Sequence, residues 1–175
     1  MVDRELIERA SALLDLCRDR KLKVAAAESC TGGLLAATLT EIPGSSDVFD
    51  RGFVTYSDDA KRTMLEVASS TLERHGAVSR ETAEAMVRGA LSHAAADLAV
   101  SITGIAGPGG GTADKPVGLV HFAAASRAGR MIHRERRFGD MGRSAVRRAA
   151  VVEALAMMRE LAQDCEPSPS KDPLP

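Results

Sequence analysis

The sequence predicts a single α/β domain, a three-layer α/β/α sandwich built around a mixed five-stranded sheet. With 175 residues, the chain is long enough for one hydrophobic core. Short apolar strands alternate with helical segments in the first half, which indicates parallel strands, and two later strands follow one another across a tight turn, which indicates a hairpin. We place the domain over residues 1–164 and expect the proline-rich tail, residues 165–175, to be disordered.

The first half begins with an amphipathic helix, because apolar residues recur on one helical face between residues 3 and 19. A strand over 23–28 leads directly into a glycine turn. Asp58 or Asp59 is a plausible cap for the helix that carries Lys61. The predicted order from the glycine turn onward is a helix over 31–40 that stops near Pro43, a strand over 51–57, and the helix with Lys61.

The second half opens with a helix from Ser79 to about residue 96, for which Ser79 is the expected cap. A buried strand over 98–103 then ends in a glycine-rich loop, residues 104–112. After this loop the sequence predicts strands over 117–125 and 131–138, joined through residues 127–129, and a final helix over 143–162.

Composition excludes several classes of function. A formal net charge of -1 argues against a general nucleic-acid binder, and no apolar run approaches the roughly 20 residues that span a membrane. Three cysteines without Cys-x-x-Cys spacing favour neither a disulfide framework nor zinc, and suit a reducing cytoplasm. The four histidines have no metal-ligand spacing, so we predict no metal.

One segment, residues 127–148, is locally basic and rich in arginine. Two interpretations of it stay open. A small anionic ligand would satisfy such a cluster, and so would water on a solvated strand and helix face.

The most informative stretch is residues 24–33, where an apolar strand runs straight into Ser29, Cys30 and a glycine turn. Backbone N–H groups at a helix start hold an anion or a developing oxyanion. We therefore predict Ser29 as a nucleophile and the N–H groups of Thr31, Gly32 and Gly33 as oxyanion donors. The alternative is that the glycines only form a tight turn.

Serine needs a base, and no histidine lies near a strand end, whereas Lys61 follows the strand that ends at Tyr56. For Lys61 to accept a proton, its pKa must fall from about 10.4 by several units. Tyr56 could relay a proton or orient Lys61. The structural alternatives are a solvated helix lysine, a tyrosine that merely favours a strand, and Cys30 as a rival nucleophile or a core residue.

The glycine-rich loop has the composition of a phosphate cradle, although it matches neither the Walker loop nor the dinucleotide fingerprint. Arg143 could pair with a phosphate, and Asp140 could instead be the helix cap beside it. The predicted substrate-binding residues are Cys30, Thr103, Gly104, Gly107, Gly109, Gly110 and Arg143.

Five motifs occur in a fixed order: residues 27–33 (Ala-Glu-Ser-Cys-Thr-Gly-Gly), 52–57 (Gly-Phe-Val-Thr-Tyr-Ser) with Lys61, 76–79 (Gly-Ala-Val-Ser), 103–108 (Thr-Gly-Ile-Ala-Gly-Pro) with 115–118 (Lys-Pro-Val-Gly), and Arg143-x-x-Val146-Arg147. Together they resemble the CinA C-terminal domain family. Relatives often have Gly-Asp-Arg directly, whereas two residues separate Asp140 from Arg143 here.

The resemblance implies an amidase that hydrolyses the carboxamide of nicotinamide mononucleotide to nicotinate mononucleotide and ammonia. It implies Ser29 as the nucleophile and Lys61 with Tyr56 as the proton-handling residues, with no cofactor and no metal. It also implies the stand-alone form of the domain and a homo-oligomer. The expected partner is this small molecule, without nucleic acid or membrane.

Two other functions fit the same residues. One is a non-catalytic nucleotide-sensing module, in which the loops bind a phosphorylated ligand for regulation. The other is an amidase for another small amide, which keeps the chemistry and changes the substrate.

Overall fold

The computed structural model describes residues 2–165, so the predicted disorder of the tail falls outside the described residues except at Cys165. The helices and strands are α1 (Arg4–Asp19), β1 (Val24–Glu28), α2 (Leu34–Thr40), the short 3-10 helix η1 (Ser45–Asp47), β2 (Phe49–Val54), α3 (Asp58–Leu65), α4 (Ser69–His75), α5 (Arg80–His93), β3 (Leu98–Gly104), β4 (Leu119–Ser126), β5 (Met131–Arg137) and α6 (Arg143–Asp164).

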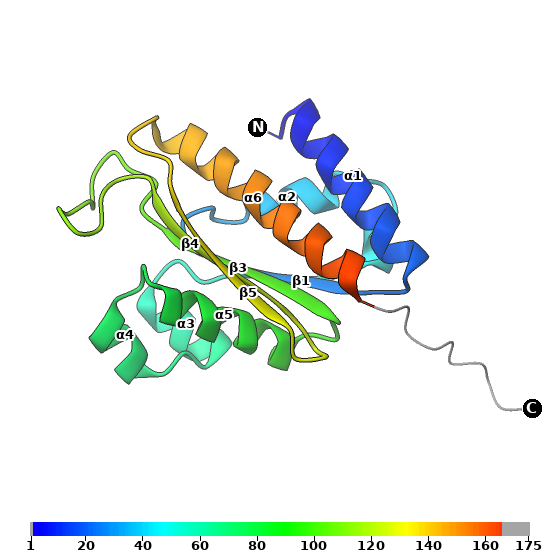
Figure 1. The fold of residues 1–175 in the computed structure, drawn as a ribbon, viewed down its shortest axis with the longest axis horizontal. Helices are drawn as coiled ribbons and strands as arrows, with labels where there is room; N and C mark the ends of the chain where they lie inside the picture. Colours follow the sequence, from blue (N-terminus) through cyan, green and yellow to red (C-terminus); the bar gives the residue numbers. More distant parts are fainter. Residues whose placement is uncertain (1, 166–175) are drawn as a thin grey trace, which may run out of the picture.

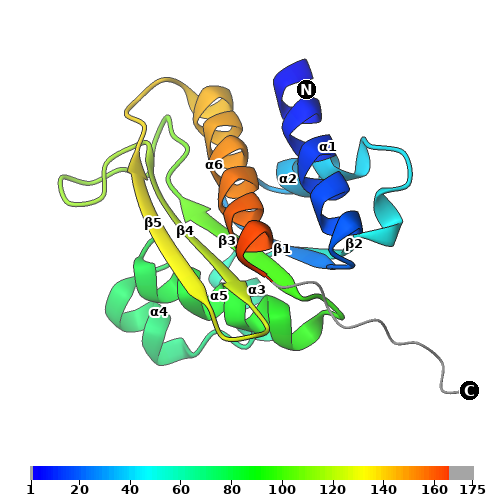
Figure 2. The same cartoon turned by 45° about the vertical axis from the view of Figure 1, so that its right-hand side comes forward.

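The five strands form one mixed sheet in the order β2-β1-β3-β4-β5. The central strand β1 runs parallel to both β2 and β3, whereas β4 is antiparallel to β3 and β5. Helices α1, α2 and α6 cover one face, and α3, α4 and α5 cover the other (Figures 1 and 2). The predicted three-layer sandwich with a mixed five-stranded sheet is confirmed.

Strand β1 is buried on both faces, as expected for a central parallel strand. Val24 and Ala26 belong to the core under α1 and α6, and Ala25 and Ala27 belong to the core under α5. Side chains alternate along a strand. At the carboxyl end of β1, this alternation directs consecutive side chains toward α2 and toward α3.

Several boundaries differ from the prediction. Strand β2 ends at Val54, so Tyr56 lies in the following loop and does not close the strand. Ser57 caps α3 because its extended backbone lets Oγ accept the N–H of Ala60 at 3.0 Å, so the predicted Asp58 or Asp59 cap is wrong. Ser79 caps α5 as predicted.

Two further differences concern helices. Helix α2 begins at Leu34 and not at Thr31, because Gly32 and Gly33 have φ values of 55° and 91°, outside the right-handed helical region. Helix α4 was not predicted. Its buried residues include only Leu72, so it lacks a strong apolar period.

Within residues 2–165, no helix is long and apolar enough to cross a membrane. In the same part of the chain, no three or more His, Cys, Asp or Glu side chains are grouped as metal ligands.

Gly89 allows α5 to approach the carboxyl end of α3. A Cβ at this position would lie 2.1 Å from the carbonyl oxygen of Leu65. Alanine normally stabilises a helix by about 1 kcal/mol relative to glycine, but overpacking costs roughly 1–3 kcal/mol or more. We expect Gly89→Ala to lower the free energy of unfolding by about 1–2 kcal/mol in urea denaturation, the clash outweighing the helix propensity.

The matched control is Gly109→Ala, because a Cβ there would meet nothing within 4 Å. This control should be nearly neutral. A stabilised Gly89→Ala variant would show that α3 and α5 are not held this closely.

Candidate active site

The segments that follow β1, β2 and β3 meet around one cavity of about 280 Å³ at the carboxyl ends of these strands. This is where ligands collect in open α/β sheets. The cavity is lined by Ser29, Cys30, Tyr56, Asp58, Lys61, Ala77, Val78, Thr103, Gly104, Ile105, Ala106, Gly107, Gly109, Gly110 and Arg143. The structure thus brings the predicted nucleophile, base and substrate-binding residues together.

Ser29 and Lys61 are in direct contact. The Lys61 Nζ atom lies 3.1 Å from Ser29 Oγ and donates a second hydrogen bond of 3.0 Å to the carbonyl oxygen of Thr55. Lys61 lies one turn inside α3 and is only 1% exposed, so the alternative of a solvated helix lysine does not hold.

Burial lowers the pKa of Lys61, because a charged ammonium loses its hydration, while the carboxylate of Asp58 opposes part of this effect. A neutral amine beside a serine hydroxyl can accept its proton. This pair therefore has the geometry and the electrostatics of a nucleophile with its general base.

The turn after Ser29 differs from the predicted oxyanion site. The N–H of Gly32 donates to the carbonyl oxygen of Ser29 at 3.0 Å, and the N–H of Gly33 donates to Glu28 Oε2 at 3.1 Å. The prediction that Gly32 and Gly33 offer free donors is therefore wrong, because both groups already have internal acceptors. Of the three predicted donors, the N–H of Thr31 has no acceptor among the described residues.

Cys30 packs into the core. Its side chain is 6% exposed and belongs to the apolar cluster under α1 and α6, although the residue also borders the cavity. Burial raises the pKa of the Cys30 thiol to about 12. Because the thiolate is the nucleophilic form, Cys30 does not compete with Ser29.

Arg143 bridges the mouth of the cavity. Its Nη2 donates to the hydroxyl of Tyr56 at 2.6 Å, and its Nη1 donates to the carbonyl oxygen of Gly107 at 3.0 Å. Tyr56 therefore contacts Arg143, and the second hydrogen bond of Lys61 goes to Thr55. The N-cap of α6 is Gly142, without a side-chain hydrogen bond, so Asp140 is not the helix cap.

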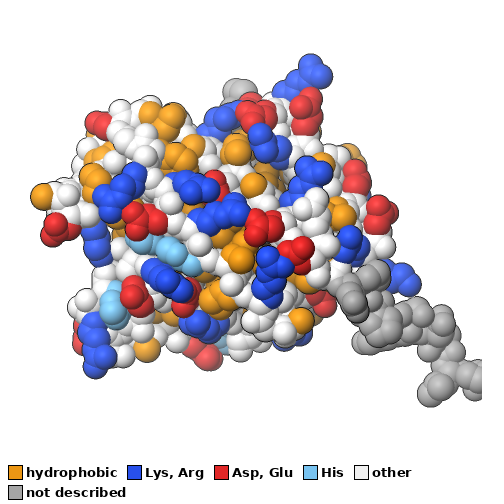
Figure 3. Space-filling model, in the orientation of Figure 1, with side chains coloured by type: hydrophobic (Ala, Val, Ile, Leu, Met, Phe, Trp, Pro, Cys, Tyr) orange, Lys and Arg blue, Asp and Glu red, His pale blue; other side chains and the backbone are white. Residues whose placement is uncertain are grey.

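Most arginines of residues 127–148 form hydrogen bonds or ion pairs with other groups of the protein. Positive and negative side chains are intermingled on the face that carries β5 and α6 (Figure 3). The partners are backbone carbonyls for Arg127, Asp164 for Arg130, Glu153 and Glu160 for Arg134, Glu153 for Arg136, Glu135 for Arg137, and Asp3 with Glu5 for Arg148. Only Arg143 and Arg147 reach the loops around the cavity.

The wall opposite α3 comes from the end of β3 and the glycine-rich loop. Thr103 Oγ1 donates to the carbonyl oxygen of Ala77 at 2.6 Å and fixes the adjacent segment. A Cβ on Gly104 would lie 2.7 Å from the carbonyl oxygen of Leu119, so only glycine fits there. Gly107, Gly109 and Gly110 leave backbone, without side chains, along the cavity.

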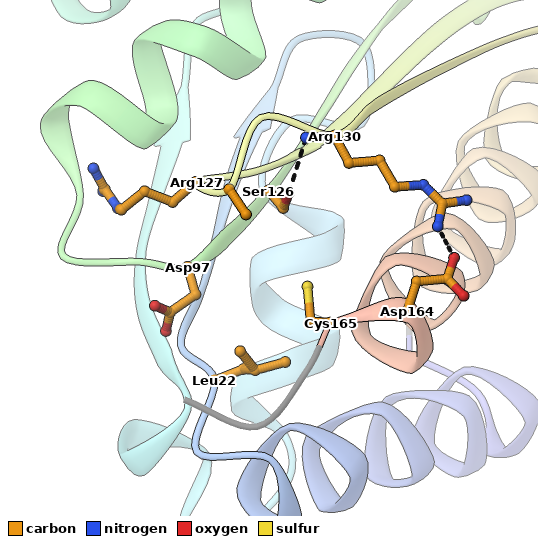
Figure 4. Close-up of a pocket in the computed structure, with 8 residues that line it drawn as sticks. Leu22, Asp97, Ser126, Arg127, Arg130, Asp164 and Cys165 are labelled. Atoms are coloured by element: carbon orange, nitrogen blue, oxygen red, sulfur yellow. Dashed lines mark hydrogen bonds and ion pairs between the residues drawn. The ribbon is translucent and has the colours of Figure 1, made fainter. Parts of the chain in front are cut away.

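A larger cavity of about 410 Å³ lies at the other end of the sheet (Figure 4). Its lining includes Asp97, Arg130 and Asp164, and Arg130 is already paired with Asp164. Ser126 and Cys165 also line it, but among the described residues neither side chain has a hydrogen bond to a carboxylate or an amine, unlike Ser29 with Lys61.

Comparison with known proteins points to one family. The family model described as the CinA C-terminal domain matches residues 7–162. Nicotinamide-nucleotide amidohydrolase PncC from Escherichia coli (strain K12) is 50% identical over 156 residues, which cover 89% of this chain and 93% of that protein. The crystal structure of the competence/damage inducible protein CihA from Agrobacterium tumefaciens is 53% identical, with a TM-score of 0.90 over 92% of this chain and 98% of that one.

Other relatives are longer. A CinA-like protein from Synechococcus sp. (strain RCC307) is 49% identical over 86% of this chain, which covers 36% of that relative. This chain spans about a third of the length of such relatives.

The buried amine leads to a pH-dependent stability difference. An unfolded lysine keeps its proton up to a pH of about 10.4, whereas folded Lys61 loses it at lower pH. Between the pKa of folded Lys61 and the unfolded value of about 10.4, the unfolded state binds more protons, so the free energy of unfolding rises with pH. Measured by urea denaturation, the wild type should gain stability relative to Lys61→Met as the pH is raised toward about 10.4. A difference that does not change with pH would contradict the lowered pKa.

Proposed function

Because this chain belongs to the CinA C-terminal domain family, we propose that it is an amidohydrolase that converts nicotinamide mononucleotide to nicotinate mononucleotide and ammonia. The substrate class comes from the name of relatives such as the E. coli protein. The observation that carries the proposal is the 3.1 Å contact between Ser29 Oγ and the 1% exposed amine of Lys61. Such a pair suits attack on an amide carbonyl.

In the proposed first step, Ser29 Oγ bonds to the carboxamide carbon while Lys61 takes the hydroxyl proton. The N–H of Thr31 is the remaining candidate of the predicted set for the oxyanion. When the tetrahedral intermediate collapses, the carbon–nitrogen bond breaks, and Lys61 returns its proton to the leaving nitrogen, which departs as ammonia. The positive charge of the pyridinium ring makes the carboxamide carbon more electrophilic.

The second step is hydrolysis of the acyl-enzyme. Water attacks the ester carbon, Lys61 takes one proton from the water, and the bond to Ser29 Oγ breaks as that oxygen regains a proton. The product is the free acid. The same lysine therefore serves as base and acid in both halves of the reaction, as in other covalent hydrolytic mechanisms.

Arg143 and the glycine-rich loop are the proposed phosphate-binding region. The hydrogen bond between Arg143 and Gly107 places the guanidinium at the loop, and α6 begins there without a side-chain cap. A guanidinium and free helix N–H groups both favour a phosphate. Tyr56, bonded to Arg143, is proposed to help position the nucleotide and to support proton transfer.

We also propose that the protein forms a homo-oligomer, as the family resemblance suggests, and that it acts in the cytoplasm, which its cysteine content suits. The proposed reaction uses a serine and a lysine, has no redox step and calls for no cofactor.

The direct test is ammonia release from nicotinamide mononucleotide by the wild type, Ser29→Ala and Cys30→Ala. Ser29→Ala should lose more than about 10³-fold in kcat, because the acyl-enzyme cannot form, while its Kd for the nucleotide changes little. Cys30→Ala is the matched control and should keep most of the activity. Normal turnover by Ser29→Ala would contradict Ser29 as the nucleophile, whereas a wild type that binds the nucleotide without releasing ammonia would favour the nucleotide-sensing module.

A second test concerns the phosphate. We expect Arg143→Gln to raise KM for nicotinamide mononucleotide by roughly 10- to 100-fold, because a charge-assisted hydrogen bond contributes about 1.5–3 kcal/mol. Turnover of free nicotinamide, which lacks the phosphate, should be slow in the wild type and unchanged by the substitution. Equal use of both substrates by the wild type would point to an amidase for another small amide.

A further inference from the structure

We propose that Glu28 and Arg147 act together as positioning residues that clamp the turn bearing Ser29, and that the clamp holds the serine in its attacking position. The inference rests on the proposed function, since it assigns roles within the same site. Neither residue lines the cavity, and both act through backbone groups of residues 31–36.

The carboxylate of Glu28 binds backbone N–H groups at the end of the turn and at the start of α2. Its carboxylate accepts hydrogen bonds from the N–H groups of Gly33, Leu35 and Ala36 at 3.1, 3.0 and 2.8 Å, and the residue is only 1% exposed. Helix α2 has no other side-chain cap. A buried carboxylate costs several kcal/mol unless such bonds compensate, so its position directly before the nucleophile calls for an explanation.

The guanidinium of Arg147 binds a backbone carbonyl group of the same turn. Its Nη2 and Nε atoms lie 2.7 and 3.3 Å from the carbonyl oxygen of Thr31 and donate to it. No carboxylate of the described residues pairs with Arg147. This is unlike Arg148, the next residue of α6, which pairs with Asp3 and Glu5.

Both side chains act from the face of the sheet that α2 and α6 cover (Figure 1), and their bonds add to those within the turn, such as the one from the Gly32 N–H to the Ser29 carbonyl oxygen. Gly32 and Gly33 both have positive φ and are conformationally permissive, so the turn has many accessible states unless it is tied. A carboxylate on the N–H side and a guanidinium on the carbonyl side leave one of these states. Misplacing a reacting atom by about 1 Å can cost 10²-fold in rate.

The test compares Glu28→Gln and Arg147→Met with Arg148→Met, the matched control on the same helix. Two rates are measured: kcat for nicotinamide mononucleotide, and the rate at which diisopropyl fluorophosphate modifies Ser29, followed by mass spectrometry. We expect both rates to fall roughly 10- to 100-fold in Glu28→Gln and Arg147→Met, with KM nearly unchanged. Arg148→Met should lose thermal stability without losing either rate.

Two readouts separate positioning from a purely structural role. Arg147→Lys, which keeps one donor, should recover part of both rates relative to Arg147→Met. The acid limb of the pH–rate profile should keep its position in the variants while the plateau falls, because the clamp does not take the proton. Unchanged rates in folded Glu28→Gln and Arg147→Met, or a loss confined to KM, would overturn the proposal.

The two reactions also distinguish this proposal from the proposed function. If the wild type releases no ammonia but the reagent still modifies Ser29 more slowly in both variants, the clamp stands and the amidase assignment fails. If the wild type releases ammonia and the variants match it in both rates, the clamp fails and the amidase stands. If Glu28→Gln does not fold, Arg147→Met and Arg147→Lys decide the outcome alone.

Discussion

The contact between a buried lysine amine and a serine hydroxyl is the interaction on which the rest of the structure depends. Removing an ammonium group from water is costly, and the cost falls when the group is neutral and hydrogen-bonded. The amine of Lys61 is hydrogen-bonded to Ser29 and to the carbonyl oxygen of Thr55, and its burial lowers its pKa. The surrounding elements fix the helix that carries Lys61. The Ser57 cap starts α3, and Gly89 lets α5 pack against the end of α3.

The topology of the sheet explains why remote residues meet. Because β1, β2 and β3 are parallel neighbours, their carboxyl ends bring Ser29, the loop before α3 and the glycine-rich loop to one edge. Helix α6 crosses this edge. One turn apart on it, Arg143 and Arg147 reach different targets: Arg143 joins Tyr56 to the glycine-rich loop, and Arg147 reaches the turn after Ser29.

The fold class could be predicted because it follows from local pattern, the alternation of strands and helices. Local pattern offered Lys61 as a partner for Ser29 but left a solvated lysine open, and the ordered motifs of the family resemblance favoured the pair. The role of Glu28 could not be predicted, because it depends on where α2 begins, and the backbone of Gly32 and Gly33 decides this. For the same reason, the prediction that the N–H groups of Gly32 and Gly33 are free donors was wrong. Arg147 belongs to the last of the five motifs, but its role depends on its contact with Thr31, which separates it from paired neighbours such as Arg148.

The central claim is that burial beside Ser29 lowers the pKa of Lys61, and the most direct measurement is an NMR titration of the Lys61 side chain in the unliganded protein, assigned with Lys61→Met. The account predicts a pKa clearly below the ordinary lysine value of about 10.4, because the amine is buried. Titration at about 10.4 would contradict it, since Lys61 would then be charged near neutral pH and unable to take the proton of Ser29.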